Sequence, residues 1–270
     1  MKAIAINASP KMDKGNTAAI LRPFLDGMRE AGAEVEVFYA AKMKINPCQG
    51  DLACWFKTPG RCAQKDDMEM LLPKLASADI LVFATPVYVD GMPGPLKNVI
   101  DRCLPLVTPF VELRDGHSRH TSREGTIPSK VVLVSSCGLW EIDNFDPLLT
   151  YLKAICRNMK REFAGALLRP HCPAFKSMVD KGEPVDDILD SAREAGHELV
   201  RTGSISSQSL TTVKGRRDHQ QARTGFHLCV LGVGQLRFID CLHERRLQEC
   251  ESGVRRGAPP TALSGFPVNG

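Results

Sequence analysis

Apolar and polar positions follow one another along the chain in a pattern that predicts strands and helices in turn. The run Ala3-Ile4-Ala5-Ile6 predicts a buried strand, and residues 18–31 then place apolar side chains at helical spacing up to Gly32. Further strands are predicted over 35–39, 79–84, 130–135 and 163–168, and further helices over 66–75, 95–106, 143–159 and 185–202. Because strand and helix alternate five times, we expect an α/β fold with a doubly wound parallel sheet.

Three segments depart from this alternation. Residues 42–65 form a loop that carries cysteines, and residues 107–129 are polar and irregular, as expected of an insertion. From Lys214 onward Gly, Arg, Cys and Gln are scattered without periodicity. We therefore expect one domain over residues 1–212. Residues 213–270 are expected to form a poorly ordered tail that adds neither fold nor chemistry and that limited proteolysis removes first.

Composition narrows the classes of function. The chain has 270 residues, is 43% hydrophobic and can bury one good core. No apolar run reaches the length of a membrane span and no signal-peptide pattern is present, so we expect a cytoplasmic protein with no membrane partner. Because disulfides are rare in a reducing compartment, the ten cysteines are expected to be free thiols or metal ligands. The net charge of +4 lies entirely in the tail from Lys214, so the neutral body predicts no nucleic-acid partner.

The loop after the first strand has the composition of a phosphate cradle. It reads Asn7-Ala8-Ser9-Pro10-Lys11-Met12-Asp13-Lys14-Gly15-Asn16-Thr17 and leads directly into a helix. The helix dipole and free N–H groups favour an anion there, Ser9, Asn16 and Thr17 add donors, and Gly15 allows close approach. The loop matches neither GxGxxG nor GxxxxGK[ST]. The alternative is an ordinary turn capped by Asn16 or Thr17.

A second loop follows the third predicted strand. It contains Thr85-Pro86-Val87-Tyr88-Val89-Asp90-Gly91, and a Pro-X-Tyr turn presents N–H groups and an aromatic edge to a flat ligand. In open α/β sheets ligands bind beyond the carboxyl ends of the strands. Both loops are therefore expected at one edge of the sheet.

Together the two loops resemble the NADPH-dependent FMN reductases and related flavodoxin-like oxidoreductases. The family pattern is Gly-Ser-Pro-Arg…Gly-Asn-Thr followed by Ser/Thr-Pro-X-Tyr…Gly…Lys…Asp-Arg, and here Ala8 replaces the leading glycine while Lys11 keeps the basic character. The resemblance covers about residues 1–210. It implies a flavodoxin-like fold, a five-stranded parallel sheet of order 2-1-3-4-5 with helices on both faces.

The resemblance also implies a set of FMN-binding residues. The phosphate would be held by Ser9, Lys11, Asn16 and Thr17 around Gly15. The isoalloxazine ring would be lined by Thr85, Pro86, Val87, Tyr88, Asp90 and Gly91. A third loop, after the fourth strand, would face the flavin through Ser136, Cys137, Gly138 and Trp140.

The cysteine loop resembles the compact cysteine motif of iron–sulfur flavoproteins, which carry four thiolates for a [4Fe–4S] cluster. Here Cys48, Cys54 and Cys62 remain, and Asp51 stands at the second position. A carboxylate could complete a weaker cluster, or three sulfurs and one oxygen could bind zinc. Because hard carboxylate suits the iron–sulfide core less well than thiolate, we favour a remnant that has lost its metal.

The resemblance implies an FMN-dependent NAD(P)H oxidoreductase that passes electrons to a small-molecule or protein acceptor. Flavin N5 would do the chemistry, so no side chain is assigned as catalytic. A homodimer or homotetramer is expected, with Trp55, Phe56 and the 107–129 insertion covering the open flavin face. The alternatives are an iron–sulfur flavoprotein electron carrier and a flavodoxin-like binding scaffold without enzymatic activity.

Overall fold

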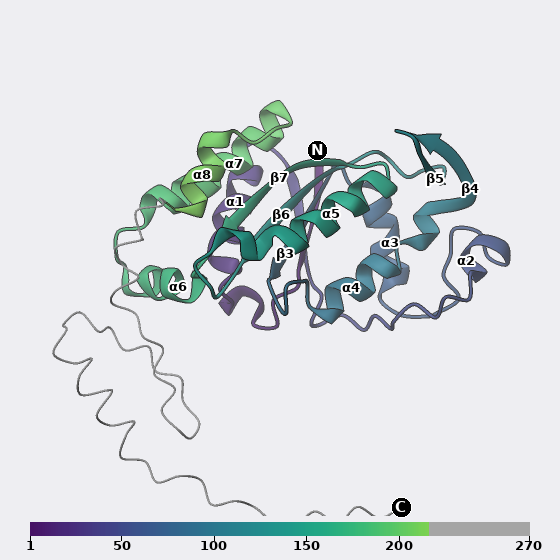
Figure 1. Ribbon diagram of the computed structural model, residues 1–270, viewed down its shortest axis with the longest axis horizontal. Coiled ribbons are helices and arrows are strands. Elements are labelled where there is room, and N and C mark those ends of the chain that lie inside the picture. The colour runs from purple at the N-terminus through teal and green to yellow at the C-terminus, as the bar shows by residue number, and fades with distance from the viewer. Residues whose placement is uncertain (216–270) are drawn as a thin grey trace, which may run out of the picture. The chain divides into compact units, whose positions relative to one another are not determined.

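A five-stranded parallel sheet lies at the centre of the computed structural model, which describes residues 1–215 (Figure 1). The strand order is β2–β1–β3–β6–β7 with every neighbouring pair parallel, which confirms the predicted doubly wound sheet and its order. The strands are β1 (Lys2–Asn7), β2 (Glu34–Tyr39), β3 (Ile80–Pro86), β6 (Lys130–Ser136) and β7 (Glu162–Arg169).

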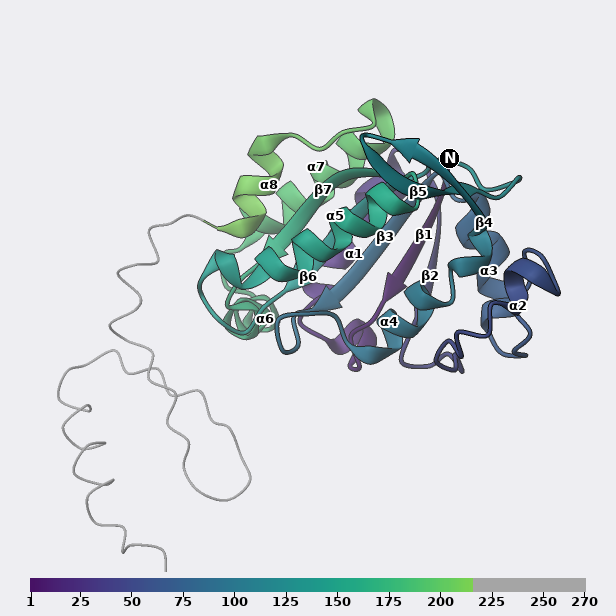
Figure 2. The ribbon, with the colours of Figure 1, turned by 45° about the vertical axis from the view of Figure 1, so that its right-hand side comes forward.

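Helices cover both faces of the sheet, as Figures 1 and 2 show from two sides. One face carries α1 (Ala18–Glu30), α6 (Cys172–Lys181) and α7 (Asp186–Thr202), with α8 (Ser207–Lys214) against β7. The other face carries α3 (Met68–Ser77), α4 (Gly94–Asp101) and α5 (Asp146–Asn158). Shorter turns of helix are α2 (Ala53–Phe56), η1 (Met12–Lys14), η2 (Leu104–Leu106) and η3 (Ile142–Phe145).

The sheet is buried on both faces, which explains why its strands read as near-continuous apolar runs. Side chains of successive strand residues point to opposite faces, so Ile4 and Ile6 enter the core under α3–α5 while Ala3 and Ala5 enter the core under α1 and α7. The small side chains of β1 leave room for α1. Glycine allows the same close approach between helices, because a Cβ on Gly196 would lie 2.1 Å from the Phe24 carbonyl oxygen.

The structure corrects the prediction for residues 107–129. Residues 107–122 are not irregular but form an antiparallel hairpin of β4 (Val107–Arg114) and β5 (His117–Ser122), and residues 123–129 connect it to β6. Its two-residue turn is Asp115-Gly116 with positive φ at both positions, the sequence that most strongly favours a tight hairpin turn. The hairpin signal was therefore present but was outweighed by the polar composition of the segment.

Other element boundaries also differ from the prediction. The helix expected over 95–106 ends at Asp101, and a short 3-10 turn, η2, follows it. The helices α6 and α8 were not predicted, because both are short, although the Ser206 hydroxyl caps α8 by accepting a hydrogen bond from the Ser209 N–H. The domain boundary expected at residue 212 falls within α8, whose Val213 is fully buried. The prediction for the tail concerns residues that lie almost entirely outside the described range.

The hairpin lies at the amino edge of the sheet. It leaves the end of α4 through η2 and returns to the start of β6, and in both views it stands near the labelled N-terminus, away from the loops that follow the strands (Figures 1 and 2). Trp55 joins the cysteine loop to it, because the indole Nε1 donates to the Val107 carbonyl oxygen at 3.0 Å. Within one chain, therefore, the hairpin and Trp55 do not cover the loops at the carboxyl edge, and their covering role across a subunit interface stays a prediction.

Candidate functional site

The loop between β1 and α1 is a tight cradle at the carboxyl edge of the sheet. The buried Asn7 accepts a hydrogen bond from the Ser9 N–H through Oδ1 at 2.9 Å, which turns the chain back over the strand end. Gly15 faces Ser9 so closely that a Cβ there would lie 2.3 Å from Ser9 Oγ. The space is therefore reserved for a residue without a side chain, as a loop that wraps a small anion requires.

The same loop leaves a buried donor without a partner. Asn7 is fully buried, and its Nδ2 atom has no hydrogen-bond partner among residues 1–215. A buried amide N–H that is left unpaired costs free energy, and this one lies at a strand end from which it can donate to an external acceptor. A phosphate oxygen at the N-terminus of α1 would supply that acceptor. Asn7 is a candidate site residue that sequence reasoning missed, although a polar residue closing an apolar strand was a visible signal.

Thr17 does not act as an ordinary helix cap. It stands immediately before α1 and is buried, but its side chain makes no capping hydrogen bond. Its hydroxyl instead lies 2.8 Å from Ser136 Oγ, at the end of β6. The alternative in which Thr17 simply caps the helix is therefore not supported by the geometry. Asn16 is half-buried beside it, whereas Lys11 is exposed at the mouth of the loop.

The loop after β3 projects from the sheet as a tight turn. Tyr88 and Gly91 exchange two backbone hydrogen bonds, of 2.9 and 3.0 Å, across Val89 and Asp90. Both central residues have positive φ, and Val89 is fully exposed. A β-branched residue in that conformation is strained and gains nothing from packing here. Such strain is characteristic of a segment shaped for contact with a ligand.

The base of this turn is fastened to the loop after β6. The Val87 N–H donates to the Ser136 carbonyl oxygen at 2.9 Å, and Ser135 Oγ donates to the carbonyl of buried Thr85 at 2.8 Å. Ser136 thus contacts the β1 loop through its side chain and the β3 loop through its backbone. All three sequence-predicted loops meet at this residue.

The third loop contains Ser136, Cys137, Gly138 and Trp140. Cys137 is buried, and its sulfur accepts a hydrogen bond from the Leu139 N–H at 3.4 Å, so it acts as a structural element of the turn. Trp140 stacks on His171, which follows β7. His171 was not predicted to be near the site, because a single histidine in a loop gives no local signal of its tertiary neighbour.

The cysteine loop lies on the α3 side of the sheet, and its four candidate ligands differ widely in environment. Cys48 is exposed, Cys54 is buried and Cys62 is half-buried. The Asp51 carboxylate accepts a hydrogen bond from the Ala53 N–H at 3.0 Å and so starts the short helix α2. Burial raises the pKa of the Cys54 thiol, and the nearby thiols of Cys62 and Cys48 raise it further.

As placed, these side chains do not fit a [4Fe–4S] cluster or a zinc ion. Within residues 1–215 no three His, Cys, Asp or Glu side chains converge in a way that could hold a metal ion. A cluster favours four thiolates around one point, whereas here a carboxylate stands at the second position and accepts a hydrogen bond from the Ala53 N–H. We therefore assign no step to a metal centre.

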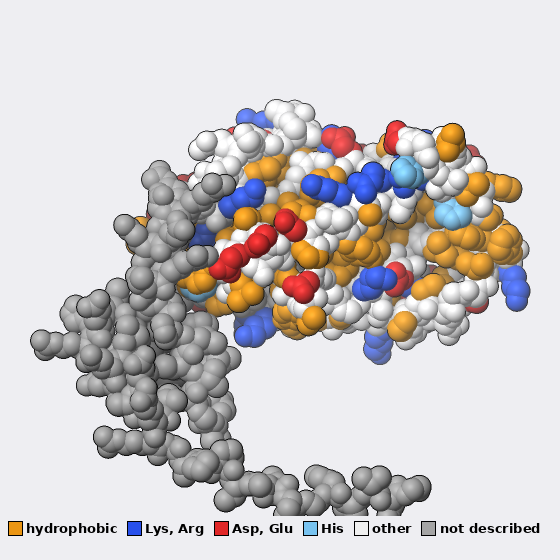
Figure 3. All heavy atoms as spheres, in the orientation of Figure 1, with side chains coloured by type: hydrophobic (Ala, Val, Ile, Leu, Met, Phe, Trp, Pro, Cys, Tyr) orange, Lys and Arg blue, Asp and Glu red, His pale blue; other side chains and the backbone are white. Residues whose placement is uncertain are grey.

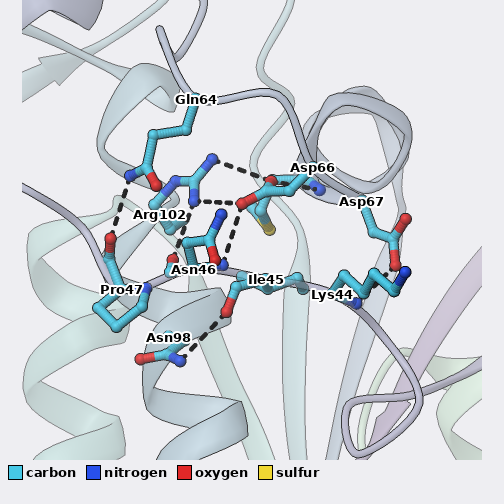
Figure 4. A network of polar contacts seen from close by, with 10 residues as sticks. Lys44, Ile45, Asn46, Pro47, Gln64, Asp66, Asp67, Asn98 and Arg102 are labelled. Atoms are coloured by element: carbon cyan, nitrogen blue, oxygen red, sulfur yellow. Dashed lines mark hydrogen bonds and ion pairs between the residues drawn. The ribbon is translucent and has the colours of Figure 1, made fainter.

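A buried ion pair holds the base of the cysteine loop (Figure 4). Arg102, at the end of α4, donates from Nη1 and Nη2 to the two carboxylate oxygens of Asp66 at 2.7 and 3.0 Å. Its Nη1 also donates to the Asn46 carbonyl at 2.9 Å, so one guanidinium joins both ends of the loop. Burial opposes ionisation of Asp66, but the hydrogen bonds from Arg102 and from the Asn46 and Met68 N–H groups outweigh it and lower the pKa of Asp66.

Comparison with known proteins agrees with this architecture. Residues 1–118 match the sequence profile of the family described as NADPH-dependent FMN reductase. An iron–sulfur flavoprotein of Methanocaldococcus jannaschii is 36% identical over 135 residues, which cover 47% of this chain and 68% of that protein. An iron–sulfur flavoprotein of Archaeoglobus fulgidus is 38% identical over 102 residues, which cover 38% of this chain and about half, 48%, of that protein.

Solved structures show the same fold at low sequence identity. An FMN-dependent NADH-azoreductase from Bacillus anthracis superposes with a TM-score of 0.53 at 17% identity, covering 74% of this chain and 97% of that one. An NAD(P)H:quinone oxidoreductase from Methanothermobacter marburgensis gives a TM-score of 0.51 at 18% identity, covering 74% of this chain and 96% of that one. With three loops converging at the carboxyl edge and a relative matched over two thirds of its length, the chain belongs to the NADPH-dependent FMN reductase family.

Proposed function

We propose that this protein binds FMN at the carboxyl edge of its sheet and passes electrons from NAD(P)H to a small-molecule or protein acceptor. The observation that carries the proposal is the meeting of the three loops at Ser136, through its side chain to Thr17 and its carbonyl to Val87. Bound FMN would supply the chemistry, because its N5 atom accepts a hydride from a nicotinamide and later releases the electrons.

The residues divide into a phosphate cradle and a ring site. Ser9, Asn16 and Thr17 would donate to the phosphate around Gly15, with the unpaired Asn7 Nδ2 close by and Lys11 adding positive charge at the mouth. The turn from Thr85 to Gly91 and the Ser136–Gly138 segment would line the ring. These two segments would orient the ring. Because the flavin would carry out the chemistry, no side chain is needed as a general acid or base.

An experiment on the phosphate cradle tests the proposal. The double variant Asn16→Ala/Thr17→Ala should weaken FMN binding about tenfold or more, because each buried donor lost costs about 1–3 kcal/mol. Flavin fluorescence titration measures the affinity, and the anaerobic oxidation of NADPH and NADH with ferricyanide as the electron acceptor measures turnover. Thr212→Ala is the matched control, because that hydroxyl bonds only within α8, to the Gln208 carbonyl. Unchanged FMN affinity in the double variant would contradict the phosphate assignment, and a colourless wild-type protein would favour the scaffold alternative.

The second candidate function is an iron–sulfur electron carrier. The names of the two similar archaeal relatives favour it, and both are called iron–sulfur flavoproteins. Asp51 in place of a fourth thiolate, with its carboxylate hydrogen-bonded to the Ala53 N–H, speaks against it in this chain. Analysis of iron and acid-labile sulfide separates it from the flavin-only protein.

We further propose that the protein assembles as a homodimer or homotetramer in the cytoplasm. Figure 3 shows hydrophobic side chains gathered at the end of the molecule formed by the hairpin and α2. Exposed members of this apolar surface are Phe56, Phe110, Val111 and Leu113. An apolar surface on an open two-stranded sheet suits burial against a second copy.

One observation on the described residues supports the proposed cytoplasmic location. The cysteines of residues 1–215 are all unpaired thiols, as expected in a reducing compartment. In the same part of the chain no helix combines the length and the apolar character that a bilayer crossing requires.

A further inference from the structure

Two arginine side chains are buried in the part of the chain that the structure describes, and they differ in their charge partners. Arg102 is 2% exposed and Arg169 is 7% exposed. Arg102 is paired with the Asp66 carboxylate through two hydrogen bonds. Arg169 belongs to none of the ion pairs within residues 1–215. Because a buried guanidinium without a carboxylate partner is costly, Arg169 has positive charge to offer to an external anion.

Neutral groups hold the Arg169 guanidinium in place. Its Nη1 donates to the Val213 carbonyl oxygen at 3.3 Å, and the group lies over the Phe175 ring, 4.4 Å from the ring centroid. Its Nε has no hydrogen-bond partner among residues 1–215. Burial lowers the pKa of Arg169, and the nearby Cys172 and the exposed Asp187 carboxylate offset this only in part. Within the described chain, therefore, no neighbouring carboxylate neutralises this charge.

Arg169 is the last residue of β7, and β7 ends at the same edge of the sheet as the proposed phosphate cradle. In the pairing of β7 with β6, Arg169 lies opposite Ser136, whose Oγ is 2.8 Å from Thr17 Oγ1. The Cys137 N–H donates to the Arg169 carbonyl oxygen at 3.0 Å. The backbone of Arg169 is thus fixed to the loop that contacts the cradle.

Cys172 connects the Arg169 charge to the cradle. It is the first residue of α6, which lies beside the loop between β1 and α1 in both views (Figures 1 and 2). The Cys172 thiol donates to the Asn16 carbonyl oxygen at 3.3 Å. Burial raises the pKa of Cys172 to about 12, and the Arg169 charge is the largest influence that opposes this rise. The field of Arg169 therefore reaches a side chain that touches the cradle.

The charged side chains of the cradle loop itself are all in water. In residues 8–17 they are Lys11, Asp13 and Lys14, and each is exposed. Salt and water screen exposed charges strongly but screen buried charges much less. A phosphate monoester carries a charge of about −1.5 to −2 at pH 7. Arg169 is therefore the cation whose burial best suits it to attract such a group.

We propose that Arg169 supplies the buried positive charge by which this site selects FMN over riboflavin, the flavin that lacks the phosphate. This inference rests on the proposed function and deepens it by naming a residue that determines flavin specificity. Arg169 acts through its charge, from behind the contact between Ser136 and Thr17, and is a positioning residue. Because FMN and riboflavin have the same isoalloxazine ring, the effect of Arg169 should concern the phosphate alone.

The ratio of the two flavin affinities tests this role. Fluorescence titration of the flavin-free, full-length protein with FMN and with riboflavin gives both Kd values, and their ratio cancels any general weakening of the ring site. Wild-type protein should prefer FMN. Arg169→Gln should lower this preference about five- to tenfold, whereas Arg169→Lys keeps the charge and should retain most of it.

Arg161→Gln is the matched control. Arg161 is also partly buried and also belongs to no ion pair within residues 1–215. Like Arg169, it donates to a backbone carbonyl, that of Leu75 at 3.1 Å, but it lies at the amino edge, just before β7. Arg161→Gln should therefore leave the preference for FMN unchanged. An unchanged preference in Arg169→Gln, or an equal loss in Arg161→Gln, would overturn the proposal.

A surface variant tests the same charge if Arg169→Gln does not fold. Asp187→Asn removes the exposed carboxylate that acts on Arg169, so the preference for FMN should rise about twofold. Glu194→Gln removes an exposed carboxylate further along α7 and should have no effect. An unchanged preference in Asp187→Asn would then overturn the proposal.

The same titrations separate this inference from the proposed function. Wild-type protein that binds neither FMN nor riboflavin would contradict the proposed function itself. Wild-type protein that binds FMN, with a preference over riboflavin that survives in Arg169→Gln, would uphold the proposed function and overturn only the role of Arg169.

Discussion

Single residues at the strand ends decide the chemistry of the carboxyl edge. Ser136 brings the three loops together, and Asn7 presents a buried donor with no partner in residues 1–215. Both lie at the last position of a strand, where the backbone leaves the sheet and its side chain can face a ligand. At this scale, the change of a single side chain should measurably alter FMN affinity or the free energy of unfolding.

Gly15 provides the first prediction. Gly15→Ala should weaken FMN binding by about 1–3 kcal/mol, because overpacking of a tight site costs that much. The added Cβ would lie 2.3 Å from Ser9 Oγ and would displace a proposed phosphate donor. Gly94→Ala is the control, since a Cβ there meets no atom within 4 Å. Flavin fluorescence titration measures both variants, and equal FMN affinities would show that the cradle is not occupied by phosphate.

Asp66 provides the second prediction. Asp66→Ala should lower the free energy of unfolding by about 3–5 kcal/mol, because it leaves the buried Arg102 charge uncompensated. Glu69→Ala is the control: it removes an exposed pair with Lys65 and should cost less than about 1 kcal/mol. Urea denaturation at pH 7 compares the two. Equal losses would mean that the buried pair contributes no more than a surface pair.

The pH dependence of the stability that this pair contributes follows from the direction in which the pKa of Asp66 is shifted. The pKa of Asp66 is lowered in the folded state, so the stabilisation is complete above the ordinary aspartate pKa of about 3.9 and is lost as the pH falls through the lower folded value. The difference in unfolding free energy between wild type and Asp66→Ala should therefore shrink in acid. A difference that grew on acidification would contradict the assignment.

At the scale of elements, the cysteine loop is joined to both α4 and the hairpin. The loop is closed at its base by Arg102 and joined at its tip to β4 by the Trp55 indole N–H. Cys54 lies buried inside this arrangement, and Asp51 starts α2. These roles require shape and hydrogen bonds but no metal.

The cysteine loop gives the third prediction. Protein purified without oxygen should contain no stoichiometric iron or acid-labile sulfide, because Asp51 is engaged by backbone and a carboxylate suits an iron–sulfide core less well than thiolate. Asp51→Cys restores the fourth thiol and should bind iron after anaerobic reconstitution, whereas Asp51→Asn should not. Stoichiometric iron in the wild-type protein would favour the electron-carrier function instead.

The hairpin gives the fourth prediction. Phe110→Ser/Leu113→Ser should shift the protein to a smaller species in analytical ultracentrifugation, because these exposed side chains belong to the apolar surface proposed as the subunit contact. Thr126→Ser, on the connection to β6, is a conservative control that should keep the wild-type assembly. A wild-type monomer, or an unchanged assembly in the double variant, would rule out this surface.

At the scale of the whole molecule, residues 1–215 contain the five-stranded sheet, two core clusters and the three loops of the proposed site. The last helix, α8, packs against β7, and Arg169 donates to the Val213 carbonyl at 3.3 Å. The unit that should suffice for flavin binding therefore ends after α8.

A pair of truncations tests this boundary and is the fifth prediction. A chain ending at Gly215 should bind FMN with wild-type affinity and keep its Tm. A chain ending at Ser206 should lose several degrees, because it removes the buried Val213 and exposes part of β7. Thermal unfolding and flavin titration measure both chains. Loss of FMN from the longer fragment would show that residues beyond Gly215 are needed for the site.

The sequence by itself determined the layers of this protein and the place of the two loops proposed to hold the flavin. Strand runs such as residues 80–84 and the helical spacing of α1 are local patterns, set by burial on two faces or on one. Parallel strands bring their carboxyl ends to one edge, so the phosphate and Pro-X-Tyr loops could be placed together before any coordinates were known.

Only the tertiary structure decided the remaining contacts. The Asp66–Arg102 pair, the Trp55–Val107 bond and the Trp140–His171 stack join residues far apart along the chain. No local propensity reports on such pairs, because their energies arise only after the helices and strands have packed. The hairpin was predictable from Asp115-Gly116 alone, but its place at the amino edge depended on where α4 ends and β6 begins.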